Sequence, residues 1–298
     1  MNLGIIGLDS SHAVQFSRIL NGKSEPFHIS GHPVTAAYPG PVSSDFDMSR
    51  ERMEKFTRSV AEEWGVKLYT SIAEVMNHSD AVFLEQVDAR RRLAQFREMA
   101  RFGKPIYVDK PFALRTEDCK EMLKLAKEYG VPVLSTSSLR FADSLTAALK
   151  QCERHSIAGA DFFGPMPFTP TQPGYFWYGV HMADMLYRTM GIGCSKISVV
   201  HTRQHDVITG VWKDGRIGSI RGNRCGNGNF GGTVYYESGN VFVDVSQDTR
   251  GYYECLVEQI IKMFDTGQSP VTNQEMTEVV RFLEAAGESL NTGREVVL

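Results

Sequence analysis

The first 135 or so residues alternate short apolar runs with segments of helical periodicity. Apolar and β-branched runs predict strands at 3–7, 34–38, 81–84, 106–108 and 131–134. Residues at three- and four-residue spacing predict helices at 11–20, 50–64, 88–102 and 117–129. A capping box, Ser71-Ile-Ala-Glu74, opens a further short helix. This alternation predicts a doubly wound parallel sheet.

After about residue 140 the pattern changes. A helix is predicted at 144–154, and another begins near residue 181. From residue 197 to 245 the pattern predicts strands and turns, with Asp214-Gly215 as a two-residue hairpin turn. Helices at about 252–266 and 272–290 close the chain, the second opened by the capping box Thr272-Asn-Gln-Glu275.

We therefore expect an α/β protein of two domains. Residues 1–138 would form a Rossmann-like doubly wound parallel sheet that binds a dinucleotide. Residues 139–298 would form an α+β domain with a large, mainly antiparallel open sheet, which serves substrate binding and oligomerisation. The last helix is a candidate to pack back on the first domain.

Composition narrows the function classes. The 298 residues carry a net charge of −3, so no basic excess favours nucleic acid or an anionic membrane as a partner. No apolar run approaches the roughly 20 residues that span a bilayer, and the N-terminus lacks the pattern of a signal peptide. The five cysteines are scattered singly, which predicts reduced thiols in the cytoplasm: Cys119, Cys152, Cys194, Cys225 and Cys255.

The segment Gly-Lys-Pro-Ile-Tyr-Val-Asp-Lys-Pro, residues 103–111, is the strongest candidate for chemistry. A predicted strand ends there on Asp109, Lys110 and Pro111. Open α/β sheets bind their ligands at the carboxyl ends of strands. An ammonium group at such a strand end can stabilise a developing alkoxide, and Pro111 fixes the backbone that follows. The alternative interpretation is a surface salt bridge next to a proline that ends the strand.

Three segments together resemble the Gfo/Idh/MocA oxidoreductases, the family of glucose–fructose oxidoreductase and inositol dehydrogenase. GKPIYVDKPFA resembles the family's Gly-Lys-x-Val-x-x-Glu-Lys-Pro signature, with Asp109 in place of the usual Glu. GYFWYGVHMADMLYRTMG resembles the segment that carries the catalytic histidine, here His181. FLEAAGESLNTGREVVL resembles the last helix and strand. The resemblance covers nearly the whole chain and implies a sugar or polyol dehydrogenase.

The resemblance also implies roles for individual residues. Lys110 would contact both the nicotinamide end of the cofactor and the substrate hydroxyl, and the Lys110–Pro111 peptide would be cis. Asp109 would orient the lysine or balance its charge. His181 would be the general acid or base, since imidazole titrates near neutral pH, although a lone histidine on a helix is often structural. Asp184, on the same helical face, would orient the ring or cap something unrelated.

The chain departs from the family pattern at the cofactor loop. The fingerprint Gly-x-Gly-x-x-Gly is replaced by Gly7-Leu-Asp9-Ser-Ser-His12, in which only Gly7 remains. Asp9 puts a carboxylate where the backbone approaches the pyrophosphate, and this charge repels an anion unless the side chain turns away. Ser10 and Ser11 offer hydroxyls and amides at a helix N-terminus. A protonated His12 would partly offset the charge of Asp9.

Two further strand ends differ from the family pattern. The second strand ends at Tyr38-Pro39-Gly40, without the acid expected to bind the adenosine ribose. The strand at 81–84 is followed by Glu85 and Gln86, where relatives carry a Thr-Pro-Asn-like turn near the nicotinamide. We still take Tyr38 and Glu85 as candidate cofactor contacts because of their positions.

In the second domain, Trp177 stands where the family has a catalytic aspartate, four residues before the histidine. An indole stacks or donates one hydrogen bond, and it cannot act as an acid. Trp177 and Tyr178 are candidates to stack on a sugar ring or to pack in an interface. Two His-x-x-x-His pairs, His201 with His205 and His28 with His32, lie in strand or loop context, so we expect no metal site.

The leading hypothesis is a cytoplasmic oxidoreductase that uses NAD or NADP and acts on a sugar, polyol or related hydroxy compound. Two alternatives stay open: a non-catalytic sensor of a sugar or nucleotide with the same fold, and a lyase or epimerase that uses Lys110 and His181 without redox chemistry. The resemblance implies a homodimer or homotetramer assembled through the second domain's sheet.

Overall fold

The computed structural model describes residues 1–151 and 156–298. The chain divides into two compact units. The first comprises residues 1–113, 117–136 and 257–272, and the second comprises residues 114–116, 137–256 and 273–298. The helix predicted at 144–154 is α6 (Asp143–Lys150). The last three residues of that prediction, and with them Cys152, lie outside the described residues.

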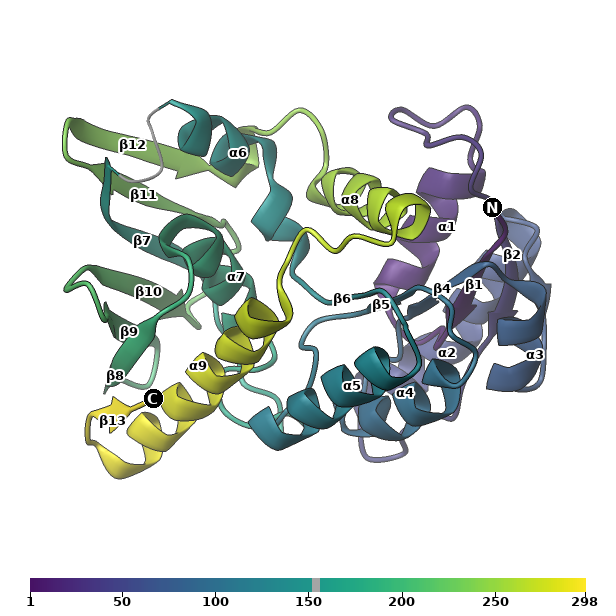
Figure 1. Ribbon diagram of the computed structural model, residues 1–298, viewed down its shortest axis with the longest axis horizontal. Coiled ribbons are helices and arrows are strands. Elements are labelled where there is room, and N and C mark those ends of the chain that lie inside the picture. Colours follow the sequence, from purple (N-terminus) through teal and green to yellow (C-terminus); the bar gives the residue numbers. More distant parts are fainter. Residues whose placement is uncertain (152–155) are drawn as a thin grey trace. The chain divides into compact units, whose positions relative to one another are not determined.

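The first unit is built on a six-stranded parallel sheet (Figure 1). Its strands run in the order β3-β2-β1-β4-β5-β6: β1 (Leu3–Ile6), β2 (Val34–Tyr38), β3 (Lys67–Leu68), β4 (Ala81–Leu84), β5 (Ile106–Val108) and β6 (Val133–Leu134). All five strand pairings are parallel, which confirms the doubly wound prediction. The strand order reverses between β1 and β4, so the crevice that binds ligands in such folds lies at the carboxyl ends of these two strands.

The helices of the first unit follow the predicted pattern. They are α1 (Ser11–Asn21), α2 (Asp47–Arg58), which continues into a π-helical turn (Ser59–Glu63), α3 (Ile72–His78), α4 (Arg92–Ala100), α5 (Thr116–Glu128) and the part of α8 (Tyr252–Thr266) that follows residue 256. Ser71 caps α3, as predicted, and Asp88 caps a 3-10 turn (Ala89–Arg91) that precedes α4. The ring of Phe83 in β4 contacts Phe16 of α1 and Phe264 of α8, so both helices cover the same face of the sheet (Figure 1).

The second unit contains a seven-stranded sheet with the order β12-β11-β7-β10-β9-β8-β13 (Figure 1). Its strands are β7 (Ile157–Pro165), β8 (Cys194–His201), β9 (His205–Trp212), β10 (Ile217–Asn223), β11 (Gly231–Tyr236), β12 (Gly239–Asp244) and β13 (Val296–Val297). Among the described strands of this sheet, only β7 and β10 pair in parallel, which confirms a mainly antiparallel sheet. The sequence did not predict β7, because its run IAGADFFGP has few β-branched residues.

Helices α7 (Gly179–Met190) and α9 (Asn273–Thr292) pack on one face of this sheet. The ring of Tyr187 in α7 contacts Trp212 of β9 and Phe282 of α9 in the core between them. The 3-10 turn Ser138–Phe141 precedes α6 in the chain, and the 3-10 turn Val245–Gln247 packs against it. In the part of the chain that the structure describes, no helix has the length and apolar character needed to span a membrane.

Candidate functional site

The Asp-Lys-Pro segment follows β5 and is buried in the first unit. Asp109 and Lys110 are 3% and 8% exposed, so the interpretation as a surface salt bridge is wrong. The Lys110 N–H donates to Asp109 Oδ1 at 2.7 Å, and the Lys110–Pro111 peptide is cis, as the resemblance implies. Burial lowers the pKa of the Lys110 ammonium below its usual value, although the Asp109 carboxylate opposes this shift.

Arg92, in the first turn of α4, fixes the backbone of this segment. Its Nη2 atom donates to the Lys110 carbonyl oxygen at 3.1 Å and lies 3.7 Å from Asp109 Oδ2. The guanidinium is almost wholly buried. The segment is therefore held by one cation on the Oδ2 side of Asp109, while Oδ1 faces a different element.

That other element is the N-terminus of α1, which carries His12. His12 Nδ1 lies 2.9 Å from Asp109 Oδ1 and 3.5 Å from Glu85 Oε2. Three strand ends thus meet, since His12 follows β1, Glu85 follows β4 and Asp109 follows β5. The sequence predicted that His12 would offset Asp9; the carboxylates beside its ring are instead those of Asp109 and Glu85.

The charged groups of this cluster shift one another's pKa values. Burial alone would lower the pKa of His12, but Asp109 and Glu85 raise it to about 9. Burial raises the pKa of Glu85 to about 7, and the nearby Asp109 charge adds to this shift. Burial would also raise the pKa of Asp109, yet His12 and Lys110 hold it below the usual range.

Asp9, the residue at the second fingerprint position, is turned into the protein. Its side chain is fully buried. Oδ1 accepts from the Val87 N–H at 2.9 Å, and Oδ2 accepts from Ser49 Oγ and Gln86 Nε2, both at 2.6 Å. Burial raises the pKa of the carboxyl group. The anticipated repulsion of an anion is reduced, because three donors already satisfy this carboxylate.

The glycines around Gln86 allow three strand ends to approach one another closely. Gly7 has φ +91°, and a Cβ there would lie 2.3 Å from the Gln86 backbone nitrogen. Gly40, after β2, has φ +81°, and a Cβ there would lie 2.3 Å from Gln86 Oε1. The pairing of β1 with β2 also continues beyond the strands, since the Leu8 N–H donates to the Pro39 carbonyl at 3.0 Å.

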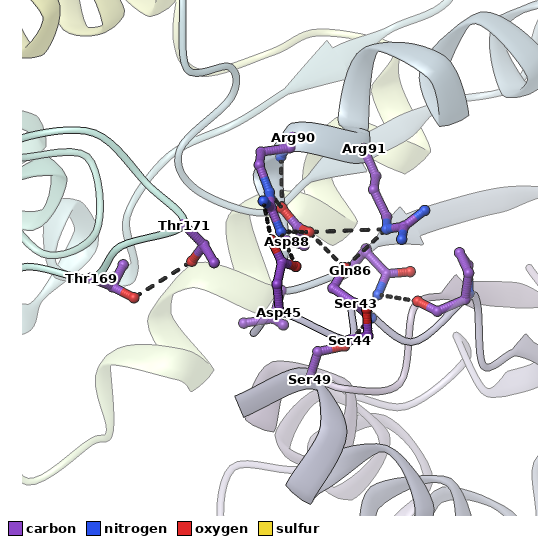
Figure 2. Close-up of polar contacts among 12 residues, drawn as sticks. Ser43, Ser44, Asp45, Ser49, Gln86, Asp88, Arg90, Arg91, Thr169 and Thr171 are labelled. Atoms are coloured by element: carbon purple, nitrogen blue, oxygen red, sulfur yellow. Dashed lines mark hydrogen bonds and ion pairs between the residues drawn. The ribbon is translucent and has the colours of Figure 1, made fainter. Parts of the chain in front are cut away.

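The loop between β2 and α2 is pinned to the end of β4 by a polar network, which Figure 2 shows. Asp88 accepts from Ser43 Oγ at 2.6 Å and from the Arg90 guanidinium. Arg90 also donates two bonds of 2.7 Å to Asp45, and Arg91 Nε donates to Ser43 Oγ at 3.0 Å. The network fixes the segment that follows Tyr38 beside the carboxyl edge of the sheet.

In the second unit, His181 lies in the first turn of α7 and contacts Ser137. The Ser137 hydroxyl oxygen lies 2.7 Å from His181 Nδ1. The Ser137 N–H donates to Asp184 Oδ2 at 2.6 Å, and Arg140 Nη1 lies 3.5 Å from Asp184 Oδ1. Asp184 therefore holds the residue that contacts the ring. Sequence reasoning missed Ser137, although the run Ser-Thr-Ser-Ser at 135–138 directly follows the strand Val133–Leu134.

Aromatic rings surround the His181 imidazole. The centroid of its ring lies 5.4 Å from that of Tyr178 and 5.6 Å from that of Phe230. Tyr178 stacks on Phe230 and also contacts Trp177. Within the second unit, the structure thus places Tyr178 against the histidine and Trp177 against Tyr178.

The residues of the β1–α1 loop fit a dinucleotide. Gly7 lets the loop pass against β4, Ser10 caps α1 through the His12 N–H, and the Asp9 charge is directed inward. A helix N-terminus of this kind binds phosphate oxygens. The end of β2, in contrast, contributes Tyr38-Pro39-Gly40 and no carboxylate to hold a ribose.

Comparison with known proteins agrees with this fold and motif. The model of the Gfo/Idh/MocA family, described as an oxidoreductase family with an NAD-binding Rossmann fold, matches residues 32–137. A search of curated proteins finds no match.

Solved structures share the fold along the whole chain. A probable dehydrogenase from Thermotoga maritima is 19% identical with a TM-score of 0.78, covering 100% of this chain and 98% of that chain. GenD2 of gentamicin A biosynthesis, solved with NAD, is 16% identical with a TM-score of 0.80 and coverages of 100% and 96%. The myo-inositol 2-dehydrogenase of Lactobacillus plantarum is 17% identical with a TM-score of 0.76 and coverages of 100% and 99%.

Proposed function

We propose that this chain, a member of the Gfo/Idh/MocA oxidoreductase family, is an NAD(P)-dependent dehydrogenase of a sugar, polyol or related hydroxy compound. The observation that carries the proposal is the buried Lys110 at the carboxyl end of β5, next to Asp109 and the switch point of a parallel sheet. The names of two similar structures, a myo-inositol dehydrogenase and a protein solved with NAD, support a hydroxyl-bearing substrate and this cofactor.

In this proposal Lys110 stabilises the substrate oxygen. A bound nicotinamide supplies the carbon that accepts or returns the hydride. The Lys110 ammonium donates a hydrogen bond to the hydroxyl oxygen and stabilises the negative charge that develops as the proton leaves. Burial lowers the pKa of this lysine, so it exchanges a proton more readily near neutral pH than an exposed lysine does.

His181 moves the substrate proton in this proposal, and Asp184 acts through Ser137. Ser137 contacts Nδ1 of the ring and, through its backbone N–H, the Asp184 carboxylate. This arrangement fixes the ring, and we assign the proton transfer to its Nε2 atom. Trp177 and Tyr178 would stack on the substrate, because aromatic faces favour the C–H faces of sugar rings.

We assign cofactor binding to residues 1–138 and substrate binding and assembly to residues 139–298. Ser10 and Ser11 at the N-terminus of α1 would bind the pyrophosphate, and Gly7 gives the backbone room for it. The other residues proposed to line or shape the cofactor site follow β1, β2, β4 and β5: Asp9, His12, Tyr38, Glu85, Asp109 and Pro111.

Cofactor titration followed by a substrate screen tests this function. Purified protein is titrated calorimetrically with the oxidised and reduced forms of NAD and NADP, and sugars and polyols are then screened at 340 nm. We expect one cofactor pair to bind and at least one hydroxy compound to be oxidised. No binding of any form contradicts the proposal and favours the sensor, while a product of unchanged oxidation level favours the lyase or epimerase.

A lysine variant tests the mechanism. Lys110→Met should lower kcat by about 10²- to 10³-fold, the effect of losing one donor to a developing oxyanion. The exposed Lys120 on α5 provides the matched control, since Lys120→Met removes the same charge elsewhere in the first unit. Equal rates for the two variants would exclude a catalytic role for Lys110.

The open face of the second unit's sheet supports a homo-oligomer. Val200, Ile217 and Phe242 are 69%, 56% and 64% exposed on it, and Phe163 stacks on Phe242. Large exposed apolar side chains on three strands of one sheet face are compatible with an association surface. Light scattering should give a dimer or tetramer, and Phe242→Lys should dissociate it; a monomer at micromolar concentration contradicts this assignment.

The described cysteines carry thiols, which agrees with action in the reducing cytoplasm.

A further inference from the structure

We propose that His12, Glu85 and Asp109 bind a divalent transition-metal ion in the first unit. The ligand atoms are His12 Nδ1 and one carboxylate oxygen from each acid, and all three lie within 4.8 Å of one another. All three residues are buried. They follow three neighbouring strands, β1, β4 and β5, so the rigid parallel sheet sets their spacing. This site goes beyond the dehydrogenase activity proposed above.

The Glu85 carboxylate is the observation that points to a ligand. Glu85 is 0% exposed, and neither of its oxygens has a hydrogen-bond partner. Oε2 is directed toward His12 Nδ1, at 3.5 Å. A buried carboxylate without hydrogen bonds is costly, and buried charges are normally paired or coordinate a metal. Binding of a metal ion would release the His12 proton to solvent, and the ion would then ligate both this acid and the imidazole nitrogen.

The spacing of the ligand atoms suits one ion. Ligands about 2.1 Å from a common ion lie about 3.0 to 3.4 Å apart at octahedral or tetrahedral angles. His12 Nδ1 lies 2.9 Å from Asp109 Oδ1 and 3.5 Å from Glu85 Oε2. Both separations are close to this range, so an ion needs only small side-chain movements.

The ligand types select the metal. Imidazole nitrogen favours Zn²⁺, Fe²⁺ and their neighbours, whereas Mg²⁺ and Ca²⁺ take oxygen ligands. One imidazole with two carboxylates therefore fits Zn²⁺, Mn²⁺, Fe²⁺ or Co²⁺ better than the alkaline-earth ions. Three protein ligands leave a coordination position for water or another ligand.

The neighbouring cations set limits on the affinity. Arg92 Nη2 lies 3.7 Å from Asp109 Oδ2, the oxygen that does not face His12. Oδ1 faces His12 and accepts one hydrogen bond, from the Lys110 N–H at 2.7 Å, so an ion would share this oxygen with that donor. The charges of Arg92 and Lys110 nevertheless oppose a further cation. We expect the site to bind an ion more weakly than the same three ligands would without these two residues.

Metal titration of chelator-treated protein without an affinity tag tests the proposal. Zn²⁺ and Mn²⁺ are titrated calorimetrically, and Co²⁺ is followed by its visible absorption. We expect one ion per chain. Glu85→Gln keeps the size of the side chain and removes its charge, and His12→Asn removes the nitrogen ligand; each should weaken binding by about 100-fold or more.

His32 supplies the matched control, because its Nε2 atom lies 2.8 Å from Asp265 Oδ1 in the first unit. Among residues 1–151 and 156–298, only His12, Glu85 and Asp109 form a group of three such ligands. His32→Asn should therefore bind one ion as the wild type does.

The proposal is overturned if the wild type binds no ion, or if Glu85→Gln binds as tightly as the wild type. Circular dichroism checks that each variant folds. If His12→Asn does not fold, the binding measured for Glu85→Gln alone tests the proposal. No substrate or nicotinamide enters this experiment, so its result is independent of the proposed dehydrogenase activity.

Discussion

His12 Nδ1 lies 2.9 Å from Asp109 Oδ1, which joins the altered glycine fingerprint to the Asp-Lys-Pro segment. The fingerprint Gly-x-Gly-x-x-Gly has its last glycine at the position of His12. The imidazole in this chain packs on Phe16 and faces Asp109 and Glu85. His12, which departs from the fingerprint, therefore contacts Asp109, the acid that precedes Lys110.

This relationship predicts how stability depends on pH in chelator-treated protein. The pKa of His12 is about 9 in the folded state against 6.5 in the unfolded chain. Because the folded pKa is raised, the contribution of His12 is complete below pH 6.5 and is lost as the pH rises through 9. A shift of this size corresponds to at most about 3 kcal/mol.

Urea unfolding of wild type and His12→Asn between pH 6 and pH 10 measures this contribution. The difference in the free energy of unfolding should shrink as the pH rises from 6.5 to 9. His32→Asn, which alters a more exposed pair with Asp265, should show a much smaller dependence. A difference that stays constant over this range contradicts the assigned pairing.

Asp9 should stabilise the cofactor loop through its three hydrogen bonds. In Asp9→Asn, an amide replaces one acceptor oxygen and faces the Ser49 hydroxyl or the Val87 N–H. We expect a loss of about 1–3 kcal/mol in the free energy of unfolding, the cost of a buried group left without its partner.

Denaturant unfolding measures this loss, and Asp47→Asn is its control. Asp47 is exposed and pairs with Arg50 on the surface of α2, so its replacement should cost less than about 0.5 kcal/mol. Equal effects of the two replacements would mean that the hydrogen bonds of Asp9 add little stability.

Gly7 should tolerate no side chain. Its φ is +91°, and a Cβ would lie 2.3 Å from the Gln86 backbone nitrogen, which cannot move without displacing the end of β4. Gly7→Ala should destabilise the protein by about 3 kcal/mol more than a glycine replacement in open space.

Gly31→Ala is the matched control for this steric effect. Gly31 has φ +85°, and a Cβ there meets no atom within 4 Å. Both variants place a side chain at a positive φ, and only Gly7→Ala adds the clash. Thermal melts of the two proteins measure the difference; similar melting temperatures would show that the loop can move away from Gln86.

Ser137 should link Asp184 to His181 and also cap the turn that follows it. Its hydroxyl accepts from the Leu139 N–H at 3.1 Å while contacting His181 Nδ1. Ser137→Ala should cost about 1 kcal/mol of stability for the lost cap and should change the chemical shifts of the His181 ring in NMR spectra.

Ser137→Thr keeps the hydroxyl and should restore both properties. Recovery of stability without recovery of the His181 shifts would assign Ser137 a purely structural role. Once a substrate is known, Ser137→Ala should lower kcat more than it changes KM, since the hydroxyl positions the ring.

Local patterns of apolar and polar residues were sufficient to predict much of the fold. The parallel sheet followed from apolar runs that alternate with helical spacing, and the hairpin at Asp214-Gly215 joins β9 and β10 as predicted. The strand β7 was missed, because a run rich in Gly and Ala gains its strand conformation from its neighbours β10 and β11. Its parallel pairing with β10 is a long-range contact without a local signal.

Strand and turn signals are local, so the sequence was enough to predict which residues stand at the carboxyl ends of the strands. It therefore identified Asp109, Lys110, Glu85 and the altered loop as candidates. It also predicted, from residue type alone, that His12 would compensate Asp9.

The pairing of these groups depends on contacts between distant parts of the chain. Asp9 turns inward because Ser49 of α2, and Gln86 and Val87 of the loop after β4, supply donors. His12 faces Asp109, 97 residues away. These contacts depend on the order of the strands in the sheet, which brings the ends of β1, β4 and β5 together. Residue spacing along the chain carries no information about the order of the strands. Burial at the strand ends then determines which charges must be paired.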